Sequence, residues 1–414
     1  MRIAQISSHD LSGRIFNGCE LQTALNQRGI MARQYVVKKE GEDSRTVRCA
    51  VPMENAIRQK LMVLEERLSM DGLLYSNSAR FIKNDPFYQE ADVAHFHIFY
   101  DGMFSLYSAA NMMRDKPSAW TLHDFWPLTG HCIHPTYPTC CDGWRSGCQT
   151  CPDLLRNFSM RADKAGQMWK IKKQLYQQID PDIVVATSWM EHYVRESPLM
   201  EHFSHIHRIP FGVHLEQYGQ TAKEEARSQF AISPESFVVA FRAEYAPDYT
   251  LKGSQYIWEA LRGIDENVVV FTVGREKAPQ DILDRFQVIQ LGWVNDAELM
   301  SAFFSACDVF LMPSAAETFG LMAVEAMASA RPVVVFEGTV LQSVTYAPEC
   351  GIAVPYKSSE GLREAVIRLI GSPEERLYRG QLGRGLAEQH YRFEDYVDRH
   401  ISLYQEIMER KAAG

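Results

Sequence analysis

The chain has 414 residues, of which 46% are hydrophobic, and a formal net charge of -9 at pH 7. This length supplies apolar material for two buried cores and suits two domains better than one. The acidic balance argues against broad binding to nucleic acid, which needs a basic surface that displaces counterions from phosphates. We therefore expect no nucleic-acid partner.

The sequence contains no apolar run of the roughly 20 residues that a membrane-spanning helix needs. It enters a strand-like run at residues 1–6, without the basic region, apolar core and cleavage site of a secretory signal. We therefore expect a cytoplasmic location, with any contact to the inner face of the membrane being peripheral.

The first half alternates strand-like runs with stretches of helical spacing, such as residues 56–70. The strand-like runs are residues 3–7, 92–96, 119–122 and 183–187. This alternation is typical of a parallel, doubly wound sheet.

A concentration of cysteines follows the third of these runs, in a loop at residues 125–155. Cys132, Cys141, Cys148 and Cys151 supply four thiolates, a set that suits a structural zinc ion, with Cys140 as a substitute ligand. Reduced, packed thiols and, less consistently with a reducing compartment, disulfides are the alternatives. A catalytic metal is not expected here, because four protein ligands leave no open position.

A basic stretch with interspersed apolar residues comes next and has helical spacing. It contains Arg161, Lys164, Met168, Trp169, Lys170, Lys172 and Lys173. Such a helix could rest against an anionic membrane surface. An ordinary solvated helix face is the alternative.

Turn-forming residues at 209–214 precede a polar stretch at 217–227, which we interpret as a linker or a peripheral helix. Alternation then resumes, with strands at residues 237–241, 268–273, 288–291, 309–312 and 333–336 and helices from about 255, 297, 321 and 361. We therefore predict an N-terminal domain at 1–212, a C-terminal domain of nucleotide-binding type at 213–390, and a helix at 391–414 that packs back on the N-terminal domain.

Two glutamates eight positions apart, Glu317 and Glu325, follow the strand at 309–312. The carboxyl end of a parallel strand is where open sheets bind ligands. A helix starting near Phe319 or Gly320 would offer free N–H groups to a phosphate. The carboxylates could then accept hydrogen bonds from a ribose and a hexose on either side of a diphosphate; a surface glutamate pair is the alternative.

Positive charge for such a diphosphate is available from Arg242 and Lys252, which both follow the strand at 237–241. A cation placed where leaving-group charge develops is an effective electrostatic catalyst. Taken singly, each could instead be a solvated surface cation.

These residues lie in an ordered set of motifs that resembles the retaining glycosyltransferases of family 4. The motifs are Phe241-Arg-Ala, Lys252-Gly, Leu291-Gly-Trp-Val, Ala306-Cys-Asp-Val, Pro313-Ser and Glu317-x7-Glu325. The resemblance implies a GT-B fold, with two Rossmann-like doubly wound domains facing across a cleft. It also implies that 1–212 is the acceptor-side domain and that 213–390 is the nucleotide-sugar-binding domain. The sequence departs from the family pattern at Phe241, where a glycine is usual, at Phe211, where asparagine is common, and in the spacing from Arg242 to Lys252.

Carried onto this chain, the resemblance implies that Arg242 and Lys252 hold the diphosphate, Glu325 the ribose and Glu317 the transferred sugar, without a divalent metal. His123 would contact that sugar or stabilise charge beside it; a structural histidine is the alternative. The remaining donor-binding positions would be Gly13, in a loop facing the diphosphate, the Trp293-Val294 stretch near the base, and the backbone of Thr318, Phe319, Gly320 and Leu321.

The segment from Thr121 to Cys132, with Cys141 to Pro152, resembles a subgroup found in bacterial exopolysaccharide clusters, including those for colanic acid. We therefore expect retaining transfer of a sugar from a UDP- or GDP-sugar to a saccharide or lipid-linked saccharide in polysaccharide biosynthesis. A sugar-nucleotide epimerase and a non-catalytic nucleotide-sugar-binding scaffold are the alternatives. The sequence lacks a clear G-x-G-x-x-G fingerprint, which argues against an NAD-dependent epimerase.

Overall fold

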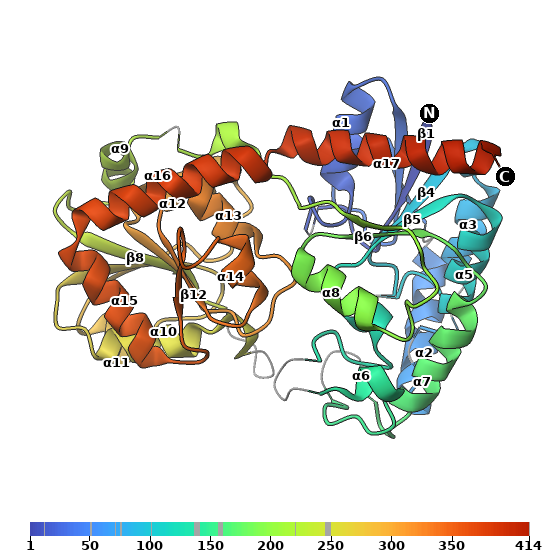
Figure 1. The fold of residues 1–414 in the computed structure, drawn as a ribbon, viewed down its shortest axis with the longest axis horizontal. Coiled ribbons are helices and arrows are strands. Elements are labelled where there is room, and N and C mark those ends of the chain that lie inside the picture. Colours follow the sequence, from blue (N-terminus) through green and yellow to red (C-terminus); the bar gives the residue numbers. More distant parts are fainter. Residues whose placement is uncertain are drawn as a thin grey trace. The chain divides into compact units, whose positions relative to one another are not determined.

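The computed structural model describes residues 1–11, 13–49, 52–70, 72–74, 77–100, 102–135, 141–155, 160–219, 221–244 and 250–413. The chain forms two compact units: Met1–Phe211 together with Glu394–Gly414, and Gly212–Phe393. Each unit is built around one parallel β-sheet flanked by helices (Figure 1).

The N-terminal unit contains a seven-stranded sheet in the order β3-β2-β1-β4-β5-β6-β7. Its strands are β1 (Arg2–Ile6), β2 (Met31–Val36), β3 (Thr46–Arg48), β4 (Val93–Phe96), β5 (Ser118–Thr121), β6 (Asp182–Val185) and β7 (Ile206–Arg208). From β1 the chain adds strands toward one edge of the sheet, and from β4 it adds them toward the other edge. The carboxyl ends of β1 and β4 therefore define a topological switch point.

Helices cover both faces of this sheet. They are α1 (Cys19–Gln27), α2 (Pro52–Leu68), α3 (Asn77–Asn84), α4 (Pro86–Glu90), α5 (Leu106–Asp115), α6 (Gly143–Ser146), α7 (Ala165–Tyr176), α8 (Ser188–Glu196) and α17 (Phe393–Ala413), with a 3₁₀ turn, η1 (Trp126–Leu128). In Figure 1, α17 lies beside α1, where Arg28 forms an ion pair with Asp398.

The two faces of the N-terminal sheet differ in character. Side chains alternate along a strand, so Ile6 and Phe96 join the apolar core that α3, α5 and α7 cover. The neighbouring positions Gln5 and His95 point to the opposite face, where both contact Tyr404 of α17. One face of the central strands is therefore apolar, and the other carries buried polar side chains.

The C-terminal unit contains a six-stranded sheet in the order β10-β9-β8-β11-β12-β13. Its strands are β8 (Phe237–Arg242), β9 (Val268–Val273), β10 (Gln287–Gln290), β11 (Val309–Met312), β12 (Val333–Phe336) and β13 (Ile352–Val354). The inner strands are almost continuously apolar, as expected for a parallel sheet that is covered on both faces. The switch point of this sheet lies between β8 and β11.

The helices of this unit complete a second doubly wound domain. They are α9 (Lys223–Gln229), α10 (Ser254–Arg262), α11 (Gln280–Leu283), α12 (Ala297–Ala306), α13 (Leu321–Ala328), α14 (Val340–Val344), α15 (Ser359–Gly371) and α16 (Pro373–His390), with 3₁₀ turns η2 (Leu215–Gln217) and η3 (Thr250–Lys252). Apolar residues of α10 and α15 pack together on one face of the sheet.

The predicted fold class, two Rossmann-like α/β domains, is confirmed. The stretch at 217–227 is not a linker, because Arg227 of α9 is buried and its guanidinium donates to the Asp308 carboxylate at 2.7 Å. Along the parts of the chain that the structure describes, no helix is both long and apolar enough to cross a membrane.

Candidate active site

The C-terminal unit gathers its predicted site residues at the switch point of the sheet. Arg242 ends β8, Lys252 lies in η3 before α10, and Glu317 lies in the connection from β11 to α13. Since β8 and β11 are neighbouring parallel strands, these residues share the edge where doubly wound sheets bind ligands.

Two loops are tied together at this edge. The backbone N–H of Ala315 donates to the Leu251 carbonyl at 2.7 Å. Gly253 has a φ of +76°, and a Cβ at this position would lie 2.0 Å from the Pro313 carbonyl oxygen. Only glycine tolerates both the positive φ and this close approach, so Gly253 allows the loop with Lys252 to reach the loop with Glu317.

Both predicted phosphate-binding cations contact carboxylates. The Lys252 ammonium donates to Glu317 Oε1 at 2.5 Å, and the Arg242 guanidinium donates to Glu244 at 3.1 Å. All four side chains are partly buried. Their positive charge is therefore held in place and locally balanced.

Helix α13 begins at Leu321, one residue after Gly320. Gly320 has a φ of +98°, and a Cβ there would lie 2.3 Å from Leu341 Cδ2, so the tight start of the helix also requires glycine. Thr318 and Phe319 precede this turn, and the Phe319 ring packs against Tyr391. Glu325 lies on α13, one turn beyond the first helical residues.

Trp293 follows β10 and is half exposed, with Val294 partly buried beside it. Two guanidinium groups lie over its ring: Arg242 at 5.3 Å and Arg275 at 4.9 Å from the ring centroid. Sequence reasoning missed Arg275, although its position directly after the β9–Gly274 turn places it at the same sheet edge. Arg242 and Trp293 thus come together, as cation–π partners.

Gly13 and His123 lie in the N-terminal unit, after β1 and β5 respectively. Gly13 has a φ of +70° in a loop whose Asp10 carboxylate accepts from the backbone N–H groups of Glu40 and Gly41. His123 stacks on Phe211, with the rings 5.7 Å apart and 19° from parallel. Burial lowers the pKa of His123 to about 3, so the imidazole is neutral at pH 7.

A buried polar network behind His123 was not predicted. His97 Nδ1 lies 3.2 Å from His123 Nε2, and His97 Nε2 lies 2.8 Å from Gln5 Oε1. Gln5 Nε2 donates to the Tyr404 hydroxyl at 2.9 Å, which lies 2.7 Å from His95 Nδ1. The alternating polar residues of His95-Phe-His97 were a signal that could have indicated this network.

The pKa of Asp124, the neighbour of His123, is also shifted by its surroundings. Burial raises the pKa of its carboxyl to about 6, although Tyr100 and the Trp126 backbone N–H donate to it. The buried Lys172 ammonium donates to the carbonyls of Trp126 and Thr129 at 2.5 and 2.9 Å. Lys172 therefore supports the loop after β5.

The surroundings of α7 show which of the residues in the predicted basic helix are buried. Lys172 and Met168 of α7 are buried, and the Trp169 indole N–H donates to the Trp144 carbonyl. The apolar side of α7 thus faces the domain interior. Contact with a membrane stays a prediction.

The four predicted zinc ligands are free thiols, whereas Cys140 lies outside the described residues. Cys148 packs with Trp144 and Ala165 in a small apolar cluster and accepts from the Gly130 N–H at 3.2 Å. Burial raises the pKa of Cys132 to about 12 and of Cys151 to about 11. Within the described ranges, no three His, Cys, Asp or Glu side chains are placed to hold a metal ion, and structural zinc stays a prediction.

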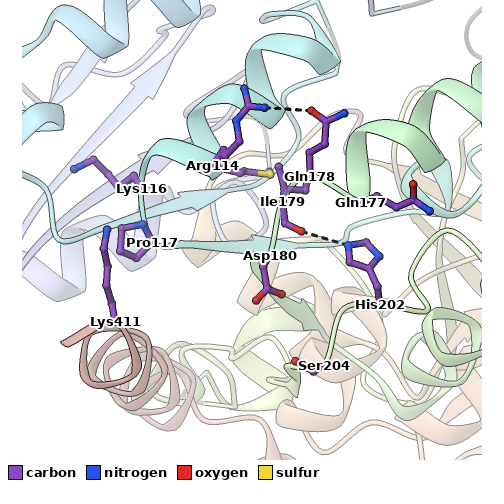
Figure 2. A pocket seen from close by; sticks show the side chains of 11 residues that line it. Arg114, Lys116, Pro117, Gln177, Gln178, Ile179, Asp180, His202, Ser204 and Lys411 are labelled. Carbon is purple, nitrogen blue, oxygen red and sulfur yellow. Dashed lines mark hydrogen bonds between the residues drawn. The ribbon is translucent and has the colours of Figure 1, made fainter. Parts of the chain in front are cut away.

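A surface pocket lies at the other end of the N-terminal sheet, before β5 and β6. Figure 2 shows two hydrogen bonds between residues that line this pocket, from Arg114 to Gln178 and between His202 and the Ile179 carbonyl. Lys116 and Lys411 also line it. Because doubly wound sheets bind ligands at the carboxyl ends of strands, we do not assign the donor to this pocket.

Comparison with known proteins agrees with this geometry. Residues 236–372 match the family model described as "Glycosyl transferases group 1". A putative colanic acid biosynthesis glycosyl transferase, WcaC, of Escherichia coli (strain K12) is 34% identical over 94 residues, which cover 21% of this chain and 22% of that protein. The matched segments span between 22% and 52% of the length of the curated relatives.

Solved structures match over almost the whole chain. Sucrose-phosphate synthase from Thermosynechococcus elongatus has a TM-score of 0.72 at 18% identity, covering 99% of this chain and 100% of that one. Anabaena Alr3699/HepE, solved in complex with UDP-glucose, has a TM-score of 0.66 at 15% identity and full coverage of both chains. The fold is therefore that of the GT-B glycosyltransferases. Residues 236–372 form a domain of the group 1 glycosyltransferase family.

Proposed function

We propose that this protein transfers a sugar, with retention at the anomeric carbon, from a nucleotide diphosphate donor to a saccharide or lipid-linked saccharide in polysaccharide biosynthesis. The observation that carries this proposal is the cluster of Arg242, Lys252 and Glu317 at the switch point of a family-matched domain. Lys252 contacts Glu317, which shortly precedes the start of α13 at Leu321, and the free N–H groups of a helix start favour an anion.

In this proposal, Arg242 and Lys252 bind the two phosphates, and the backbone from Thr318 to Leu321 contacts phosphate and sugar. Glu325 accepts hydrogen bonds from the ribose hydroxyls, and Glu317 from hydroxyls of the transferred sugar. The Lys252–Glu317 ion pair would then align the phosphate next to the sugar, because Lys252 would bind the phosphate and Glu317 the sugar. A divalent metal is not needed, since two side-chain cations and a helix start balance the diphosphate charge.

The reaction breaks the bond between the anomeric carbon and the diphosphate oxygen and forms a bond to the acceptor oxygen on the same face. The acceptor hydroxyl proton moves to an oxygen of the departing diphosphate. The transition state resembles an oxocarbenium ion, and Arg242 and Lys252 stabilise the negative charge that develops on the leaving group. No protein nucleophile is required.

The N-terminal unit would provide Gly13, next to the diphosphate, and His123, next to the transferred sugar. His123 is neutral at physiological pH, so it would act as a hydrogen-bond partner and not as a cation. The Trp293-Val294 stretch would lie near the base, with the exposed Trp293 ring available for stacking. UDP-glucose is the first donor to test, since the HepE structure contains it.

A catalytically silent nucleotide-sugar-binding scaffold and a sugar-nucleotide epimerase remain the alternatives to test against. An epimerase would convert its donor without an acceptor, and a scaffold would bind the donor without any turnover. The presence of Lys252 and Glu317 in direct contact favours catalysis over a silent scaffold.

The mechanism is tested by following the anomeric proton of donor and product by NMR during transfer to a lipid-linked acceptor extract. We expect an α-linked donor to give an α-linked product. An inverted product would reject the same-face mechanism, and conversion of donor in the absence of any acceptor sugar would favour the epimerase.

A further inference from the structure

The surface pocket at the amino ends of β5 and β6 belongs entirely to the N-terminal unit. Its volume is about 620 Å³, and residues in or next to the last turns of α5, α7 and α17 line it (Figure 2). A cavity of this size accommodates a small ligand. Among the described residues at its wall, the imidazole of His202 is the only aromatic ring. The pocket therefore offers little flat apolar surface on which a nucleobase could stack.

Lys116 is a partly buried cation in the connection from α5 to β5. Its ammonium donates to the carbonyls of Ala91 and Gln89, at 2.5 and 3.2 Å, and both of these acceptors are neutral. Burial lowers the pKa of Lys116, the charge of Lys411 lowers it further, and Asp92 acts in the opposite direction. The two lysines therefore repel each other, and an anion between them would relieve the repulsion.

Lys411 is held at the pocket by its neighbour on α17. The Arg410 guanidinium donates at 2.6 Å to Asp182, the first residue of β6, whose carboxylate also lies 2.7 Å from His207 Nε2. Asp182 is buried, so this contact fixes the last turns of α17 against the start of the strand. Figure 2 shows Lys411 extending from α17 toward Pro117. The charge of Arg410 is balanced by Asp182, whereas that of Lys411 faces the pocket.

Arg114 is the third cation on the pocket wall, beside Lys116 and Lys411. Its guanidinium donates to a neutral group, the Gln178 amide oxygen, at 3.1 Å. Among the described residues, no ion pair joins any of these three cations to a carboxylate, and Asp180 is the only carboxylate at the wall. The ends of α5 and α7 add about half a negative charge each. Three full positive charges outweigh these contributions, so the pocket keeps a net positive charge.

We propose that this pocket binds the phosphate group of a phosphate monoester, with Lys411, Lys116 and Arg114 as its ligands. Such a group carries a charge of about −1.5 to −2 at pH 7 and has three acceptor oxygens. A tetrahedral phosphate can accept from cations in three directions, whereas a carboxylate presents two oxygens in one plane. Bound phosphate would join the end of α17 to the connection between α5 and β5.

This site is separate from the proposed donor site, because it lies at the amino ends of the strands and contains none of the donor-site residues. Its existence therefore does not rest on the proposed function. The phosphate monoester could be a soluble molecule or the headgroup of a lipid such as phosphatidic acid, since both present the same group to the three cations.

The experiment follows the methyl group of Met113, which lines the pocket, by ¹³C NMR of the full-length protein labelled at its methionine methyl groups. Met113→Leu identifies the signal. Glycerol 3-phosphate is the soluble probe, and acetate at equal ionic strength is the comparison anion. Cosedimentation with vesicles of phosphatidylcholine and phosphatidic acid tests the lipid headgroup.

Three variants separate this pocket from other sites that could bind an anion. Lys411→Met removes one proposed ligand and leaves Arg410 in contact with Asp182. Lys170→Met is the matched control, since Lys170 is an exposed lysine of α7 that lies outside the pocket wall. Lys252→Met reports phosphate that binds at the proposed donor site instead. Near-UV circular dichroism shows whether each variant is folded.

We expect glycerol 3-phosphate to shift the Met113 signal in the wild type, in Lys170→Met and in Lys252→Met, and acetate to leave it unchanged. In Lys411→Met the affinity for glycerol 3-phosphate should be at least about fivefold weaker, because a charge-assisted contact is lost at a solvent-accessible site. Vesicle binding that is lost in Lys411→Met, without a response to glycerol 3-phosphate, would support the pocket and assign the phosphate to a lipid headgroup.

Three results would overturn the proposal. The first is that neither glycerol 3-phosphate nor the vesicles bind. The second is that acetate shifts the Met113 signal as strongly as glycerol 3-phosphate does. The third is that binding is unchanged in folded Lys411→Met, or is lost in Lys252→Met instead.

Discussion

At the scale of single residues, the contact between Lys252 and Glu317 is the feature on which the donor site depends. The sequence indicated that both residues follow a strand, because polar motifs after apolar runs can be recognised in the sequence. It could not show that they touch, since their contact depends on the close approach of Gly253 to Pro313, a residue far along the chain.

Replacing Lys252 by methionine should keep the fold and lower the affinity for a nucleotide diphosphate by at least about tenfold, because a charge-assisted contact to phosphate is lost. Titration calorimetry measures this directly. Arg262→Met is the matched control: Arg262 pairs with Asp281 at the far end of α10, away from the site. Equal affinities of the Lys252 variant and the wild type would show that the diphosphate binds elsewhere.

At the scale of elements, most inner strands were predictable and most edge strands were not. Strands β9, β11 and β12 coincide with the predicted runs, because buried parallel strands are continuously apolar. The three-residue strands β3, β7 and β13 were missed, since so short a segment has no periodicity of its own. The polar face of β1 and β4 was also missed, because its partner Tyr404 comes from the other end of the chain.

The contact between the loops of Gly253 and Pro313 predicts that two glycines differ in how well they tolerate replacement by alanine. Gly253 and Gly338 both have positive φ, at +76° and +69°, but a Cβ at Gly253 would collide with the Pro313 carbonyl, whereas a Cβ at Gly338 would meet open space. Gly338→Ala should cost about 1 kcal/mol of unfolding free energy from φ alone. Gly253→Ala should cost more and also weaken nucleotide binding, measured by urea unfolding and calorimetry. Equal losses would mean that the loops are not held together at this point.

The cysteine loop gives a second prediction at this scale. Structural zinc on Cys132, Cys141, Cys148 and Cys151 stays a prediction, and it requires these thiols to converge more closely than in the described residues. Mass spectrometry of the native protein should then show bound zinc that is lost in Cys148→Ser. A zinc-free native protein whose thiols all react after unfolding would instead establish reduced, packed cysteines.

At the scale of the whole molecule, the buried histidines predict acid sensitivity. Burial lowers the pKa of His95, His97, His123 and His400 in the folded state. As pH falls below about 6.5, the unfolded chain takes up protons first, so each neutral buried histidine costs up to about 1.4 kcal/mol of stability per pH unit. Asp124 opposes this, because its raised pKa, about 6, favours the folded state on acidification.

Four histidines outweigh one carboxyl, so the free energy of unfolding in urea should fall clearly between about pH 7.5 and about pH 5.5. The exposed His192, whose ring is 61% accessible, provides a control in His192→Asn, which should leave the slope unchanged. A stability that is flat across this range would contradict neutral burial of the four rings.

The central claim is that the C-terminal unit binds a nucleotide diphosphate sugar at the edge formed by Arg242, Lys252 and Glu317. The most direct measurement is the shift in melting temperature of the protein with UDP, GDP and their sugars, since a ligand that binds only the folded state must stabilise it. We predict a clear shift with one nucleotide family, lost in Lys252→Met and kept in Arg262→Met. No shift with any of them, or one that Lys252→Met does not reduce, would contradict the donor site.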